Sequence, residues 1–140
     1  MKFRSVAAIA LLSLAAESAA ALDGERKSFQ IFRVETPPVI DGKLDDAVWV
    51  NAPGIDDFHQ TSPGDGTPST ERTVVRVAYD DEYLYIAANL LDSEPAAIQA
   101  KQMIQGKLFH SDDRFWVTLD SFNNKRNDYF FQVNANGVRR

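Results

Sequence analysis

Thr73-Val-Val-Arg-Val-Ala-Tyr79, followed by Asp80-Asp-Glu82 and Tyr83-Leu-Tyr-Ile-Ala-Ala-Asn-Leu90, is the stretch that decides the fold class. Side chains on a β-strand alternate between its two faces. In the first run, one face of the strand carries Val75, Val77 and Tyr79. In the second run, one face carries Leu84, Ile86, Ala88 and Leu90. Because a short acidic turn joins the two runs, the stretch predicts an antiparallel β-hairpin.

Further alternating runs predict further strands. Residues 114–120 place on one face Phe115, Val117 and Leu119, and residues 129–134 place on one face Tyr129, Phe131 and Val133. A weaker alternation at residues 29–34 predicts an N-terminal strand, which ends before Pro37 and Pro38 because proline has no N–H for a ladder. Together these runs predict an all-β domain.

Helical signals are few and short. Residues 44–49 predict a single helical turn that places Leu44, Val48 and Trp49 on one side, with Trp49 in the core. A second helix is predicted from Ser93, a residue suited to an N-cap, through about Ile104, with Gly106 ending it.

The N-terminus has the pattern of a secretory signal peptide. Lys2 and Arg4 precede an apolar run at residues 6–16, which ends in small residues up to Ala21. A signal peptidase recognises this order of charge, apolar run and small residues, so residues 1–21 are predicted to be a cleaved signal peptide. Residues 22–37, which follow it, are predicted to form an N-terminal strand and a linker. An N-terminal core helix, the alternative, lacks a polar second face. We expect export to the periplasm or outer membrane of a Gram-negative bacterium.

The charge balance excludes some partners. The chain has a net charge of −5, and removal of residues 1–21 leaves 13 basic and 19 acidic residues, a net charge of −6. Binding to phosphates requires clustered lysine and arginine, so we expect neither nucleic acid nor an anionic membrane surface as a partner. The chain has no cysteine and therefore no disulfide.

The C-terminus predicts a hairpin turn with little after it. Asn136-Gly137 follows a strand, and this pair is a strong signal for a two-residue hairpin. Only Val138, Arg139 and Arg140 come after it, so we expect a domain that is incomplete at its C-terminus. The alternative is a frayed end after an edge strand.

Four segments in order resemble one family. They are residues 40–49 (Ile-Asp-Gly-Lys-Leu-Asp-Asp-Ala-Val-Trp), 77–86, 112–120 and 129–137. Together they are similar to carbohydrate-binding module family 9-like domains, over residues 38–140. The closest resemblance is to the N-terminal module of large exported bacterial proteins whose C-terminal part resembles an outer-membrane β-barrel.

This resemblance implies both a fold and a function. The fold is an antiparallel β-sandwich of immunoglobulin-like or jelly-roll-like architecture, here incomplete and with one short helix. The function is binding of a polysaccharide or oligosaccharide, in the service of carbohydrate catabolism beside a glycoside hydrolase or an outer-membrane barrel. Structural calcium occurs in some members.

Trp116 is the candidate centre of a sugar site. If its neighbours Phe115 and Val117 face the core, Trp116 points to the other face of the sheet, where an indole can stack on a pyranose ring. The side chains predicted to hydrogen-bond sugar hydroxyls are Arg76, Gln132 and Asn134. The alternative is that Trp116 packs under a loop or further strands, as large aromatic residues commonly do.

Acidic pairs offer oxygen ligands for calcium. The candidate site consists of Asp112, Asp113 and Asp120, because calcium prefers carboxylate oxygens. The alternative is that these aspartates serve turns, which the residue type favours for local reasons.

The sequence indicates no catalytic set. His59 and His110 have no third group placed beside them by sequence spacing, so we expect a domain that is not an enzyme. Two rivals to sugar binding remain. One is a non-catalytic docking domain of an outer-membrane protein, and the other is a fragment of a glycoside hydrolase, in which acidic pairs would line a cleft.

Overall fold

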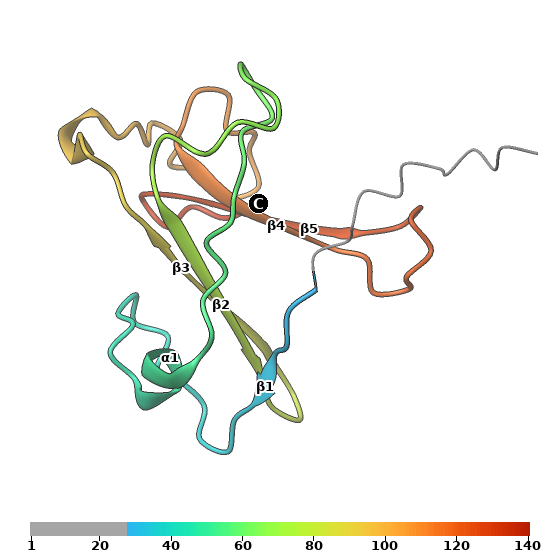
Figure 1. Ribbon diagram of the computed structural model, residues 1–140. Helices are drawn as coiled ribbons and strands as arrows, with labels where there is room; N and C mark the ends of the chain where they lie inside the picture. The colour runs from blue at the N-terminus through green and yellow to red at the C-terminus, as the bar shows by residue number, and fades with distance from the viewer. Residues whose placement is uncertain (1–27) are drawn as a thin grey trace, which may run out of the picture. The chain divides into compact units, whose positions relative to one another are not determined.

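The computed structural model describes residues 28–140, and the predicted signal peptide at residues 1–21 lies outside them. The chain divides into residues 1–30 and a unit at residues 31–140. In order, the elements of the second unit are β1 (Phe32–Arg33), α1 (Ala47–Asn51), β2 (Thr73–Tyr79), β3 (Leu84–Leu90), the 3₁₀ turn η1 (Pro95–Ala97), β4 (Arg114–Leu119) and β5 (Tyr129–Asn134) (Figure 1). None of the helices in residues 28–140 has the length and apolar character needed to cross a membrane.

The first sheet has the strand order β1-β2-β3. Its centre is the predicted hairpin, in which β2 and β3 pair antiparallel from Thr73 opposite Leu90 to Tyr79 opposite Leu84. The weak N-terminal strand is shorter than predicted, and it pairs parallel to β2 rather than antiparallel. Arg33 of β1 forms an ion pair of 2.6 Å with Asp81 in the hairpin turn, which holds the short strand at this edge.

The second sheet is the antiparallel pair β4–β5, with Trp116 opposite Gln132. Gly137 makes the predicted turn with φ +74°, a conformation that glycine adopts without steric cost. The chain then folds back along β5, where Gln132 and Arg140 exchange two backbone hydrogen bonds of 2.9 Å. Residues 138–140 therefore extend this sheet on the side of β5 away from β4.

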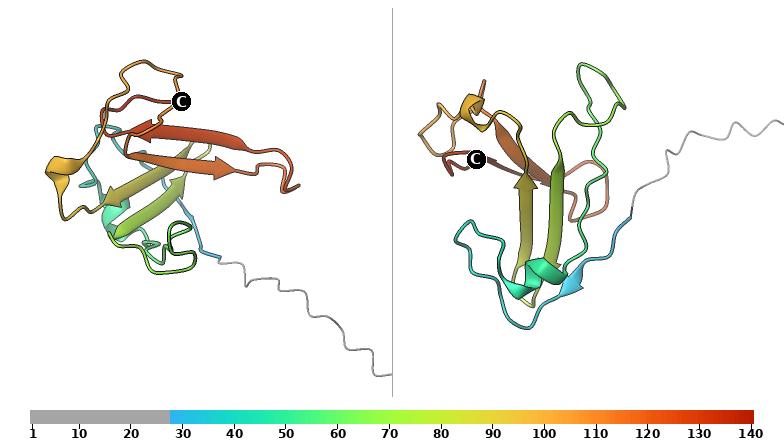
Figure 2. Two further views of the ribbon diagram at one scale, coloured as in Figure 1. Left: turned by 90° about the horizontal axis from the view of Figure 1, so that it is seen from above. Right: turned by 60° about the vertical axis from the view of Figure 1, so that its left-hand side comes forward.

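The two sheets form layers. Figure 2 shows β4–β5 lying across one face of β2–β3, and apolar residues of both sheets face each other across the space between them. On the other face of β2–β3 lies the main core, where Trp49 of α1 is only 4% exposed and packs with Ala78, Tyr85 and Ala87. The predicted helical turn and the core position of Trp49 are both confirmed. The mostly β architecture with one short α-helix is that of the predicted fold class.

The helix predicted from Ser93 to Ile104 is wrong. Only the 3₁₀ turn η1 forms in this region. The backbone N–H groups of Lys101 and Gln102 donate to the carboxylate of Asp112, and that of Gln99 donates to Asp113. These side-chain acceptors belong to the two residues before β4, so tertiary hydrogen bonds replace the helical ones that local sequence favoured.

Candidate functional site

Trp116 lies on the outer face of β4–β5, the face that points away from the first sheet. The residue is 52% exposed, whereas its neighbours Phe115 and Val117 turn inward and are partly buried. Its ring lies 6.4 Å from that of Phe130 at an interplanar angle of 39°, and the guanidinium of Arg114 lies over it at 5.3 Å. An aromatic ring is thus held by two neighbours and still presents a large surface to solvent.

A groove of about 350 Å³ surrounds this ring. We call it the Trp116 groove, and its lining consists of Leu108, Phe109, His110, Arg114, Trp116, Phe130, Gln132 and Arg140. Strand pairing places Gln132 beside Trp116, and two backbone hydrogen bonds hold Arg140 next to Gln132. Arg114 donates from Nη1 to the carbonyl of Phe109, which draws residues 108–110 over the same face.

The structure brings only part of the predicted sugar site together. Gln132 lies beside Trp116 but is only 7% exposed, and Asn134, at 5%, is a structural residue. Its side chain donates to the carbonyl of Gln102 at 2.9 Å and to Asp112 at 2.8 Å. Asn134 is therefore occupied with holding a loop.

Arg76 does not belong to the Trp116 groove. It lies on β2 in the first sheet, on the face that carries Ala78 and packs against α1. Its side chain donates to Asn89 Oδ1 at 3.3 Å. The prediction that Trp116 lies on an outer face is correct for its strand, but the prediction that Arg76 lies on a non-core face is wrong. Arg76 shares its face of β2 with Ala78, and that face carries the main core, whereas Trp116 lies on the outer face of the other sheet.

The predicted calcium ligands do not form a shared site. Asp112 accepts hydrogen bonds from the N–H groups of Lys101 and Gln102 and from Asn134 Nδ2, and Asn134 is the main cause of its lowered pKa. Asp120 instead accepts hydrogen bonds in the β4–β5 turn from the backbone N–H of Lys125, the main cause of its lowered pKa, and from that of Asn124.

These N–H donors occupy carboxylate oxygens that a cation would need. Asp113 in turn accepts from the backbone of Gln99. Within residues 28–140, no three acidic or histidine side chains gather as a metal site would require. The structure thus does not bring the three aspartates together, and calcium binding by this chain stays a prediction.

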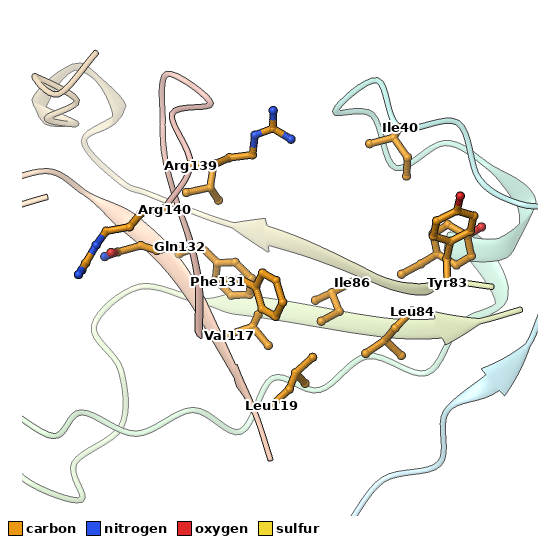
Figure 3. A pocket seen from close by; sticks show the side chains of 13 residues that line it. Ile40, Tyr83, Leu84, Ile86, Val117, Leu119, Phe131, Gln132, Arg139 and Arg140 are labelled. Atoms are coloured by element: carbon orange, nitrogen blue, oxygen red, sulfur yellow. The ribbon is translucent and has the colours of Figure 1, made fainter. Parts of the chain in front are cut away.

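A second and larger groove, of about 570 Å³, lies between the two sheets (Figure 3). We call it the inter-sheet groove. Its lining is mostly apolar and comes from the inward faces of both sheets, including Leu84, Ile86, Val117, Leu119 and Phe131. Tyr83 and Arg139 also line this groove, but most of its lining is aliphatic or aromatic, whereas half of the residues that line the Trp116 groove carry hydrogen-bonding side chains beside an exposed indole. The Trp116 groove is therefore the better carbohydrate site.

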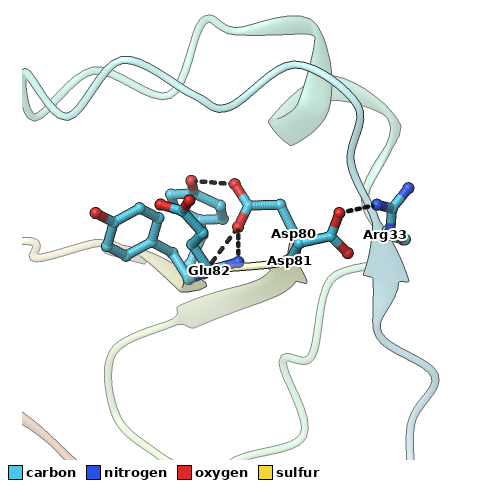
Figure 4. A network of polar contacts seen from close by, with 6 residues as sticks. Arg33, Asp80, Asp81 and Glu82 are labelled. Carbon is cyan, nitrogen blue, oxygen red and sulfur yellow. Dashed lines mark hydrogen bonds and ion pairs between the residues drawn. The ribbon is translucent and has the colours of Figure 1, made fainter.

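The acidic turn between β2 and β3 has a structural role (Figure 4). Asp80 accepts hydrogen bonds from the backbone of Glu82 and Tyr83 and from the Tyr85 hydroxyl, at 2.6 to 2.8 Å. The Tyr85 hydroxyl is the main cause of the lowered pKa of Asp80, and the same bond raises the pKa of Tyr85 to about 12. The ion pair with Arg33 lowers the pKa of Asp81.

Several groove residues were not predicted from the sequence. The alternation of β5 places Phe130 on the same face as Gln132, so the pattern was sufficient to find it. Arg114 follows from Trp116 in the same way, two residues earlier on β4. His110 and Arg140 depend on how a loop and the chain after Gly137 fold back, and no local pattern indicates that.

A mostly β domain with an exposed aromatic ring beside hydrogen-bonding side chains is the arrangement expected of a carbohydrate-binding module. Residues 40–139 match the family described as Carbohydrate family 9 binding domain-like. The chain belongs to this family, and its domain is a non-catalytic one for which the family implies a carbohydrate ligand. Neither curated proteins nor solved structures provided a match.

Proposed function

We propose that the chain binds a polysaccharide or oligosaccharide in the Trp116 groove. The observation that carries the proposal is the Trp116 ring, 52% exposed on a hydrogen-bonded strand pair. Other aromatic residues of the chain are as exposed, but Trp116 shares one groove with hydrogen-bonding side chains, and an aromatic surface with a few polar groups around it is the usual composition of a ligand site.

The chemistry of the groove suits a sugar ring. The apolar C–H face of a pyranose stacks on an indole, while its hydroxyls need hydrogen-bond partners around the rim. Arg114 and His110 supply such groups from the start of β4 and the loop before it. Phe130 and Arg114 contact the indole already, so the ring loses little conformational freedom on binding.

The test is the replacement Trp116→Ala, with calorimetric titration against a panel of soluble oligosaccharides. We expect the binding free energy to become less favourable by about 2 kcal/mol or more, because an aromatic anchor at the centre of an interface carries much of the binding energy. The matched control is Phe122→Ala, which removes an exposed aromatic ring from the β4–β5 turn, outside the groove. If the wild-type chain binds no glycan, the docking-domain function replaces this proposal.

We further propose that the chain is exported and acts at the periplasm or outer membrane, in carbohydrate catabolism beside a glycoside hydrolase or an outer-membrane barrel. The support is the signal-peptide pattern of residues 1–21 and the family. Fused to a periplasmic reporter, residues 1–25 should direct secretion and be cleaved near Ala21. An uncleaved product in the cytoplasm would refute export.

A further inference from the structure

We propose that the Trp116 groove selects anionic glycans, in which a pyranose ring carries a carboxylate or a sulfate group. This inference rests on the proposed sugar binding and specifies its substrate class. The groove is lined by two arginines and a histidine, and no aspartate or glutamate is among its lining residues. A groove of this composition attracts negative charge at the position where the sugar ring stacks.

The composition of the groove contrasts with that of the chain, which has 20 acidic and 15 basic residues. Arg114 and Arg140 form no ion pair with any carboxylate in residues 28–140. The nearby Asp112 does not line the groove, and its oxygens accept hydrogen bonds from two backbone N–H groups and Asn134. The guanidinium groups of Arg114 and Arg140 therefore have no acidic side chain as an ion-pair partner within residues 28–140.

Strand register places Arg140 two strands away from Trp116, on the same face of the sheet, with Gln132 between them. Trp116 is the cross-strand partner of Gln132, and Gln132 exchanges two backbone hydrogen bonds with Arg140. These three residues thus form one row across the sheet, and residues in such a row share a face with side chains about 5 Å apart. Figure 3 shows the Gln132 and Arg140 side chains pointing to the same side, away from Phe131.

Arg114 supplies the second charge from the other side of the row. Its guanidinium lies over Trp116 at 5.3 Å, and one of its nitrogens donates to the carbonyl of Phe109. These contacts hold the guanidinium in place. Its remaining N–H groups form the fork that matches a carboxylate or sulfate, both of which accept two hydrogen bonds from arginine.

The experiment compares matched polymers that differ only in charge. Polygalacturonate is paired with its methyl-esterified form, and dextran sulfate with dextran, and binding to the full chain is measured by affinity electrophoresis and calorimetry. We expect at least one anionic polymer to bind roughly fivefold more tightly than its neutral partner, and the difference to shrink with added salt because exposed charges are screened. The two pairs distinguish a carboxylate from a sulfate as the preferred group.

Arg140→Gln is the decisive variant, and Arg139→Gln is its control. Arg139 is also exposed, but it pairs with Val133 and does not line the Trp116 groove. Both arginines line the inter-sheet groove, so the two variants differ in their effect on the Trp116 groove. We expect Arg140→Gln to weaken binding of the anionic polymer roughly two- to fivefold with no effect on the neutral one. Arg139→Gln, which also removes one positive charge, should leave the affinities for both the anionic and the neutral polymer unchanged. Thermal unfolding of both variants confirms that they are folded.

Two results would overturn the inference while leaving sugar binding intact. One is equal affinity of the wild-type chain for neutral and anionic polymers, and the other is an equal loss for Arg139→Gln and Arg140→Gln, which would indicate general charge attraction. Failure to bind any of the four polymers or the oligosaccharide panel would instead refute the proposed function itself.

Discussion

At the scale of single residues, the two tryptophans of this chain have opposite environments. Trp49 is 4% exposed in the core between α1 and β2–β3, whereas Trp116 is half exposed on β4. Trp49→Ala should therefore lower the free energy of unfolding by about 3–5 kcal/mol, since it removes a buried aromatic side chain and leaves a cavity. Trp116→Ala should cost about 1 kcal/mol, because only its contacts with Phe130 and Arg114 are lost. Urea denaturation of both variants checks this, and equal losses would show that Trp116 is a core residue.

The hydrogen bond between Tyr85 and Asp80 should make stability depend on pH. The pKa of Asp80 is lowered in the folded state, so its contribution is present above about pH 4 and is lost as the pH falls through the lower folded value. The pKa of Tyr85 is raised to about 12, so its contribution is complete below about pH 10 and is lost as the pH rises toward the folded value.

Tyr85→Phe should flatten both sides of the stability profile, measured as the urea midpoint between pH 2 and 12. Part of the acid side should remain, because the pKa values of Asp81 and Asp112 are also lowered. Tyr83→Phe is the control, since the Tyr83 hydroxyl forms no hydrogen bond in the part of the chain described. A profile that is the same for both variants would contradict the role given to the Tyr85 hydroxyl.

At the scale of elements, Asp112 joins the loop after η1 to the second sheet. Its carboxylate accepts from the backbone of Lys101 and Gln102 and from Asn134 of β5. Asp112→Ala would leave these donors without an acceptor, so we expect a loss of about 3 kcal/mol in the free energy of unfolding. Hydrogen exchange of the Lys101 and Gln102 amides should accelerate in the same variant.

Asp113→Ala is the matched control for this prediction. Asp113 is exposed and accepts one hydrogen bond, from the backbone of Gln99, so its removal should cost about 1 kcal/mol. If the two variants lost the same stability, Asp112 would not be the residue that anchors the loop.

At the scale of the whole described unit, the inter-sheet groove exposes apolar side chains. Phe131 is 55% exposed there, and Leu84 on the facing sheet is 44% exposed. We expect the native chain to bind the dye ANS and raise its fluorescence, because such dyes bind exposed apolar surface. Phe131→Ser should reduce the emission, while Phe122→Ser, in the β4–β5 turn outside the groove, should not. Native emission no higher than that of the free dye would contradict an open groove.

The sequence alone determined the hairpin, the strands β4 and β5, and which side chains of each strand share a face. Alternation is a local property, because consecutive side chains of a strand point to opposite sides whatever the rest of the chain does. For that reason it predicted β2–β3, the inward direction of Phe115 and Val117, and the outward direction of Trp116. The four segments in order, from residue 40 to residue 137, were enough to indicate the family that residues 40–139 match.

Only the tertiary structure decided which outward-facing residues meet. Arg76 and Trp116 lie in different sheets, and Arg76 is on the face that α1 covers, because the element that covers each face depends on long-range packing that no local pattern records. The same holds for the region after Ser93, where carboxylates of Asp112 and Asp113 capture the N–H groups that a helix would have used. Arg140 reaches the Trp116 groove because Gly137 turns the chain back along β5. Local periodicity sets the direction of a side chain, whereas its neighbours are set by the packing of segments far apart in sequence.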